Sequence, residues 1–195
     1  ETTVKVFDQM RKLQSYTDEG SPGRDWNVAT GMVIEGKAGF QIMGDWAKGE
    51  FTAAGKTPGV DYYCSPTPSN NGYLYNVDSF IFYKTSDPDK QEGQKLLAKL
   101  MMGKNFQKVF NLYKGSIPAR LDVSMDEFDK CAKTSNADIK TAGASGGLVP
   151  SFAHGMAQGN TMKAALQDII TEHFNSDMSS VDAANALADS VLANM

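Results

Sequence analysis

The stretch that decides the fold of this chain reads Gly36–Lys37–Ala38–Gly39–Phe40–Gln41–Ile42–Met43–Gly44–Asp45–Trp46. Its middle part, residues 38–43, is short, apolar and mostly alternating, and this pattern predicts a β-strand. Asp45 is a favourable N-cap residue, so we expect a helix from Trp46 to Ala54. A strand that leads directly into a helix is typical of α/β proteins, and open α/β sheets bind ligands near such junctions.

Helix and strand patterns alternate on both sides of this stretch and then give way to helices alone. The further predicted elements are helices over 2–16, 25–34, 105–113, 162–174 and 184–191, strands over 62–64 and 77–83, and a loop over 65–72. So few strands make a poor sheet under so many helices. We therefore expect an α/β chain that is a piece of a larger protein, with the missing strands upstream.

Two of the later helices carry clear start signals. Asp87 followed by Pro88 is a cap with proline in the first turn. The helix that follows should bury an apolar stripe formed by Leu96, Leu97, Leu100 and Met101. Ser179, with Asp182 three residues later, predicts the cap of the last helix.

Composition excludes several classes of protein. A net charge of −4 and a pI near 5.2 leave no basic excess for binding nucleic acid. With 41% hydrophobic residues, the chain has the composition of a folded globular protein. It has no apolar run long enough for a membrane-spanning helix. It begins at Glu1 without a signal-peptide pattern, and we expect that a segment preceded it.

Motifs for catalysis and metal binding are weak. Gly55–Lys56–Thr57 lacks the earlier glycine of a phosphate-binding loop, because Glu50 stands there, and a helix end with a turn explains it better. Neither HExxH nor CxxC occurs, so nothing predicts a metal site. The carboxylates are scattered, and no cysteine is placed beside a histidine. We expect neither an enzyme nor a bound cofactor.

Two features of the residues leave alternatives open. Cys64 and Cys131 are an even pair that could form a disulfide or remain two buried thiols. Trp46 follows a predicted strand, where its flat apolar face could stack on the C–H face of a pyranose. On its own, however, the position favours a core tryptophan over a ligand contact.

Several segments together resemble a known family. Residues 36–46 resemble the run of extracellular solute-binding proteins in which a strand leads into Gly-x-Trp and delivers a stacking tryptophan. The longer set, in order along nearly the whole chain, is similar to the glucose-binding proteins of Gram-negative ABC importers; it comprises residues 23–51, 76–80, 114–120 and 150–155.

The resemblance implies a type II periplasmic-binding-protein-like fold and a set of sugar contacts. Trp46 would be the stacking aromatic, whereas Trp26 would lie in the core. The hydroxyl partners would be Asn76, Asp78, Lys114 and His154. Such a set is chemically sensible, because each sugar hydroxyl both donates and accepts hydrogen bonds.

The resemblance also implies an organisation and partners. Proteins of this family have two lobes with a sugar in the cleft, and this chain would be the helix-rich C-terminal portion. Residues 1–82 would belong to the C-terminal lobe, 83–120 would return to the N-terminal lobe, and 121–195 would complete the C-terminal lobe; the N-terminal half would be missing.

The implied function is binding of a monosaccharide, with glucose as the best match, for delivery to permease subunits in the inner membrane. The implied compartment is the periplasm, where oxidising conditions would favour a Cys64–Cys131 disulfide. The alternatives are a sugar-sensing module for a signalling partner and, more remotely, a carbohydrate-active enzyme.

Overall fold

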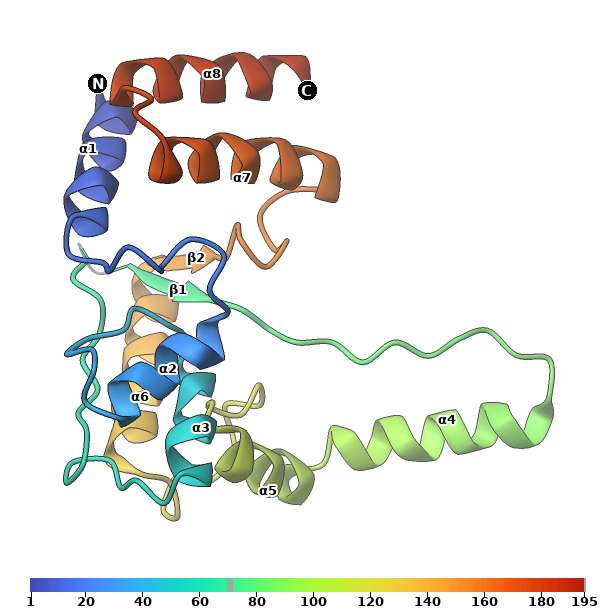
Figure 1. Cartoon of the computed structure of the whole chain (residues 1–195). Coiled ribbons are helices and arrows are strands. Elements are labelled where there is room, and N and C mark those ends of the chain that lie inside the picture. Colours follow the sequence, from blue (N-terminus) through green and yellow to red (C-terminus); the bar gives the residue numbers. More distant parts are fainter. Residues whose placement is uncertain (70–71, 195) are drawn as a thin grey trace. The chain divides into compact units, whose positions relative to one another are not determined.

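The computed structural model describes residues 1–69 and 72–194 of the chain (Figure 1). Residues 70 and 71, inside the predicted loop over 65–72, lie outside the described residues. The chain divides into two compact units. Unit 1 comprises Glu1–Arg24, Leu74–Asn76 and Pro150–Met195, and unit 2 comprises Asp25–Tyr73 and Val77–Val149.

Unit 1 is built around the helices α1 (Thr2–Gln14), α7 (Asn160–Asn175) and α8 (Ser180–Ala193), which pack on one another as Figure 1 shows. Their apolar faces meet around Phe7, Leu166 and Ala183, which are all buried. His173 is buried among them, with its ring 4.7 Å from the ring of Phe7. The predicted cap of the last helix is confirmed, because Ser179 Oγ accepts a hydrogen bond from the Asp182 N–H at 3.1 Å.

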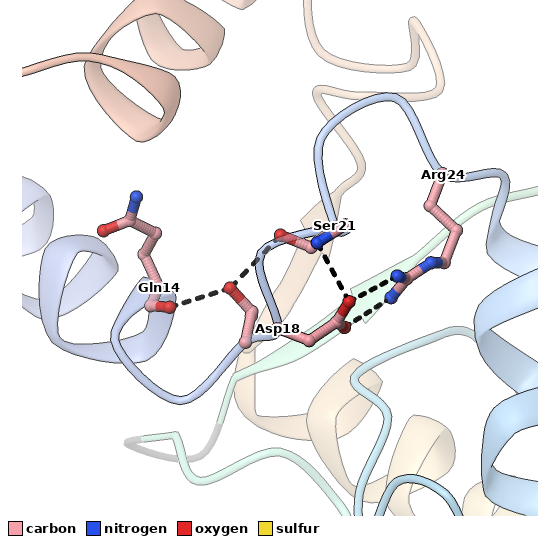
Figure 2. Close-up of polar contacts among 6 residues, drawn as sticks. Gln14, Asp18, Ser21 and Arg24 are labelled. Carbon is pink, nitrogen blue, oxygen red and sulfur yellow. Dashed lines mark hydrogen bonds and ion pairs between the residues drawn. The ribbon is translucent and has the colours of Figure 1, made fainter.

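The polar segment after α1 is ordered by one ion pair. Both terminal nitrogens of the Arg24 guanidinium group donate to the Asp18 carboxylate, at 2.7 and 2.6 Å (Figure 2). The same carboxylate accepts the Gly20 N–H at 3.0 Å. Mainly through its hydrogen bonds, Arg24 lowers the pKa of Asp18 to about 2. The segment after α1 is therefore closed by a specific contact.

Unit 2 contains the remaining helices: α2 (Trp26–Ile34), the 3₁₀-helix η1 (Asp45–Ala47), α3 (Lys48–Ala53), α4 (Pro88–Met101), α5 (Lys104–Lys114) and α6 (Lys130–Ser145). The predicted helix over 46–54 is present as η1 followed by α3. Helix α3 ends at Ala53. The φ of 71° at Gly55 and the bond from Lys56 N–H to Phe51 O confirm a helix end with a turn.

A disulfide joins Cys64 to Cys131 in unit 2, with 5.7 Å between their Cα atoms, so the pairing is confirmed. It attaches the segment before residue 65 to the start of α6. Asp129 caps that helix by accepting the Ala132 N–H at 2.9 Å, and it also pairs with the buried Lys48 at 2.7 Å. The stacked rings of Phe51 and Tyr62 lie 4.1 Å apart beside this network.

The sheet differs from the prediction. The strands are β1 (Tyr73–Tyr75) and β2 (Leu148–Pro150), and they pair with each other. The predicted strands over 38–43, 62–64 and 77–83 are wrong, apart from an isolated bridge between Tyr62 and Pro58. A strand needs a neighbour to take its backbone hydrogen bonds, and within residues 1–69 and 72–194 no other segment pairs with these runs.

Helix α4 begins as predicted but does not bury the predicted stripe. Asp87 Oδ1 accepts the N–H groups of Asp89 and Lys90, at 3.0 and 3.3 Å, and Pro88 opens the helix. Yet Leu96, Leu97 and Leu100 are all exposed, and the buried residue of α4 is Met101. The predicted stripe is wrong because the described parts of unit 2 place little over this helix, which Figure 1 shows extending away from α5.

The core assignment of Trp26 is also wrong. Trp26 is the first residue of α2, and its side chain is exposed. The contacts at this end of the helix are made by its backbone instead, since Thr30 Oγ1 and Gln41 Nε2 both donate to the Trp26 carbonyl. The buried residue of α2 is Thr30. None of the helices in the described parts of the chain is long and apolar enough to cross a membrane.

Candidate sugar-binding site

Trp46 lies in the middle of η1 and is half-buried. Its indole ring folds back over Gly44, where any side chain would overlap the six-membered part of the ring. This contact gives the Gly-x-Trp spacing a physical meaning, since only glycine two residues earlier leaves room for the ring in this position. The backbone therefore holds the aromatic face in place from one side.

Asp45 does not have the predicted role. It lies inside η1, and no side-chain cap precedes α3. Its carboxylate accepts a hydrogen bond from the backbone N–H of Ile117 at 3.1 Å. Burial raises the pKa of Asp45, while the N–H groups of Ile117 and Trp46 and the charges of Lys48 and Lys114 act in the opposite direction. Asp45 thus connects the Trp46 segment to a part of the chain about seventy residues later.

The start of α3 and the end of α5 meet backbone to backbone. A Cβ atom on Gly49 would lie 2.9 Å from the carbonyl oxygen of Lys114, and one on Gly115 would lie 2.7 Å from the Gly49 nitrogen. Gly115 also has a φ of 90°, which ends α5 in the left-handed conformation that glycine adopts easily. Glycine is therefore needed at both positions for the two helices to approach this closely.

Lys114, the last residue of α5, forms an ion pair with Asp78. Its ammonium group also lies 5.7 Å from the centre of the Phe110 ring. The Lys114 side chain is 29% exposed and that of Asp78 is 61% exposed, so the pair is partly exposed to solvent. The structure thus brings together two residues that the sequence assigns to the same site.

The other two predicted residues, Asn76 and His154, belong to unit 1. Asn76 directly follows β1 and is half-buried. His154 is exposed, and its Nδ1 lies 2.7 Å from the hydroxyl of Ser151, which is itself buried. The Ser151 hydroxyl also accepts the His154 N–H at 3.4 Å. Ser151 therefore orients the imidazole.

Sequence reasoning missed the residues that support the site. Asp45, Gly49, Gly115 and Ser151 act through contacts with distant or buried atoms, which spacing alone does not reveal. A signal was present in the resemblance, because all four residues lie within its runs over 23–51, 114–120 and 150–155. Within residues 1–69 and 72–194, no cluster of three or more His, Cys, Asp and Glu side chains could hold a metal ion.

Comparison with known proteins places this chain in a family. The model of the bacterial extracellular solute-binding proteins matches residues 1–141. A probable sugar-binding periplasmic protein of Brucella suis is 46% identical over 98% of this chain and 45% of its own length. One of Rhizobium meliloti is 44% identical over 96% of this chain and 45% of its own length.

A more distant relative is an uncharacterized ABC transporter extracellular-binding protein of Pyrococcus horikoshii, 33% identical over 88% of this chain and 38% of its own length. The chain thus spans less than half the length of the curated relatives it matches. The helix-rich fold with one small sheet is consistent with a portion of a periplasmic-binding-protein-like fold. Because the family model covers most of the sequence, this chain belongs to the bacterial extracellular solute-binding proteins.

Proposed function

We propose that this chain is part of the sugar receptor of an ABC-type importer, which binds a glucose-like monosaccharide and returns it unchanged. The observation that carries the proposal is the 46% identity, over nearly the whole chain, to a protein named as sugar-binding and periplasmic. The Cys64–Cys131 disulfide supports the same compartment, since disulfides persist in the oxidising periplasm. The receptor would deliver its sugar to permease subunits in the inner membrane.

The proposed ligand contacts have complementary chemistry. Trp46 offers an aromatic face held by Gly44, on which a pyranose with mostly equatorial hydroxyls can stack its C–H patches. Asp78 accepts and Lys114 donates hydrogen bonds, and charged partners form the stronger bonds to hydroxyl groups. Asn76 and His154 can each donate and accept. The proposal assigns these five residues to one monosaccharide.

We further propose that the lobes follow the divisions expected from the sequence. Residues 1–82 and 121–195 would form part of the C-terminal lobe, and 83–120 would return to the N-terminal lobe. The rest of the receptor would correspond to the part of the relatives that this chain does not span. The 195-residue chain alone should then bind sugar weakly, because a partial cleft leaves one face of the ring in water.

The proposal is tested by calorimetric titration of the full-length receptor with glucose, galactose, maltose and a panel of amino acids. Trp46→Ala should weaken glucose binding by roughly 2–4 kcal/mol, as for other buried aromatic anchors. Asp78→Ala should weaken it by about 1–3 kcal/mol, since it leaves sugar hydroxyls without an acceptor. Trp26→Ala is the matched control, because it removes an exposed indole outside the proposed set.

The outcomes separate the parts of the proposal. If Trp46→Ala and Asp78→Ala both bind glucose as tightly as the wild type, the site is wrong. If maltose binds at least about tenfold more tightly than glucose, a difference of 1.4 kcal/mol, the receptor binds a longer sugar. Chemical change of labelled glucose during incubation would favour an enzyme instead.

A further inference from the structure

We propose that Asp45 is a positioning residue, which fixes Lys114 relative to Trp46 and thereby sets the affinity for sugar. This inference rests on the proposed function and deepens it. No sugar contact is assigned to Asp45 itself. It acts through the backbone of the two segments that carry the proposed aromatic and cationic contacts.

A hydrogen bond from Ile117 N–H to Asp45 Oδ2, at 3.1 Å, connects the two segments. Asp45 directly precedes Trp46, and Ile117 is the third residue after Lys114. One carboxylate in unit 2 therefore joins the Trp46 segment to the turn that follows Lys114. The acceptor is a carboxylate, so the hydrogen bond is charge-assisted. Because Asp45 is largely shielded from water, loss of the bond would leave a partly buried N–H unpaired.

The second step is that the turn after α5 is held on both sides of that bond. Before it, Gly115 packs against the Gly49 backbone, with no space for a side chain on either residue. After it, Pro118 is fully buried. The Asp45 bond is a third contact on the same turn. Its loss should loosen the packing of Gly115 on Gly49 and so let Lys114, at the end of α5, shift relative to Trp46.

The third step concerns the charges around Asp45. Lys48 and Lys114 both act on its carboxylate, yet each already has another partner. Lys48 is buried and lies 2.7 Å from Asp129, and Lys114 pairs with Asp78. Neither ammonium group therefore has Asp45 as its ion-pair partner, so the proposed positioning acts through the Ile117 hydrogen bond.

The test uses the full-length receptor and glucose as the ligand. Asp45→Ala should weaken glucose binding about tenfold or more, which corresponds to one buried hydrogen bond. Asp45→Asn keeps an oxygen acceptor for Ile117 N–H and should lose less than Asp45→Ala. Asp61→Ala is the matched control, because Asp61 also accepts a backbone N–H in unit 2, from Thr57 at 2.7 Å, and should bind like the wild type.

A role through Lys114 has a signature that general destabilisation lacks. In a Lys114→Met background, which removes the positioned group, Asp45→Ala should have little further effect on binding. If Asp45→Ala does not fold, Asp45→Glu provides the test instead. It keeps the charge but displaces the acceptor by one methylene, and it should also weaken binding. Additive effects of Asp45→Ala and Lys114→Met, or wild-type binding by Asp45→Ala or Asp45→Glu, would overturn the inference.

Failure of the proposed function would look different. In that case Trp46→Ala and Lys114→Met would themselves leave glucose binding unchanged, and the inference would be overturned together with the site. If those two variants weaken binding while the Asp45 variants do not, the site stands and the positioning role alone is overturned.

Discussion

Helices α4 and α8 begin alike and end in different surroundings. Each has 14 residues, and each starts with a side-chain cap, Asp87 for α4 and Ser179 for α8. Helix α8 packs on α7 and α1 and buries Ala183 completely. Helix α4 leaves Leu96 and Leu100 about 60% exposed.

The comparison separates what a helix owes to its own sequence from what it owes to its neighbours. Capping acts within one turn, so both starts form as predicted. Burial of an apolar face needs a second surface, which unit 1 supplies to α8 and the described part of unit 2 does not supply to α4.

The largest difference in the free energy of unfolding should come from replacing one leucine in each unit by alanine. Leu166 in α7 is 8% exposed and Leu100 in α4 is 61% exposed. Leu166→Ala should lower the free energy of unfolding by about 2–5 kcal/mol, because it leaves a cavity. Leu100→Ala should change it by less than about 0.5 kcal/mol. Urea unfolding of the 195-residue chain measures both, and equal losses would show that α4 is covered in solution.

Reduction of the disulfide should act on one unit only. Cys64 and Cys131 lie 67 positions apart in unit 2, and opening such a loop costs typically about 2–4 kcal/mol. Hydrogen exchange should accelerate in α6 and remain unchanged in α7 and α8. The measurement is mass spectrometry before and after reduction. Two free thiols in the denatured, unreduced protein would contradict the pairing.

Removing the caps should affect the two helices equally. Asp87→Ala and Ser179→Ala each delete acceptors of first-turn N–H groups, and each should lower the stability of its own helix by about 1 kcal/mol. Hydrogen exchange at the first turns of α4 and α8 reports the effect. A much larger loss for Ser179→Ala would mean that packing, and not only the cap, depends on this residue.

Mild acid should weaken the helix packing of unit 1. Burial lowers the pKa of His173, the nearby Arg11 lowers it further, and Asp8 acts in the opposite direction. Its Nδ1 is buried and has no hydrogen-bond partner among residues 1–69 and 72–194, and Nε2 lies 3.4 Å from Ser180 Oγ. Since the unfolded chain takes up a proton near pH 6.5 and the folded chain only at lower pH, stability should fall as pH drops below about 6.5.

The control for this pH dependence is His173→Phe, which keeps an aromatic ring against Phe7 and cannot be protonated. Urea unfolding at pH 7 and pH 5 should show a smaller difference for the variant than for the wild type. The same difference in both proteins would assign the pH dependence to other groups.

Local signals in the sequence were sufficient for most of the helices, although α6 was not predicted, and they were insufficient for the sheet. The caps at Asp87 and Ser179 and the helix end at Gly55 depend on adjacent residues, so they could be predicted. The apolar runs over 38–43 and 77–83 have strand composition, but strands form only where another segment accepts their backbone hydrogen bonds. The exposure of Trp26 could not be foreseen for a similar reason, since packing partners decide it.

The candidate site was predictable in part. Asp78 and Lys114 came from the family resemblance, and the structure shows them as an ion pair. The bond from Ile117 to Asp45 could not be predicted, because the same aspartate is a good helix cap in isolation. Its actual role depends on a turn about seventy residues later in the chain.

The disulfide has a consequence for how the chain would withstand proteases. The bond between Cys64 and Cys131 closes a covalent ring that contains α4 and the irregular segment 77–86, which is largely exposed. Such a segment is a favoured site of cleavage. A single cut there opens the ring but releases no fragment, so the nicked chain should migrate as one band on a non-reducing gel and as two after reduction.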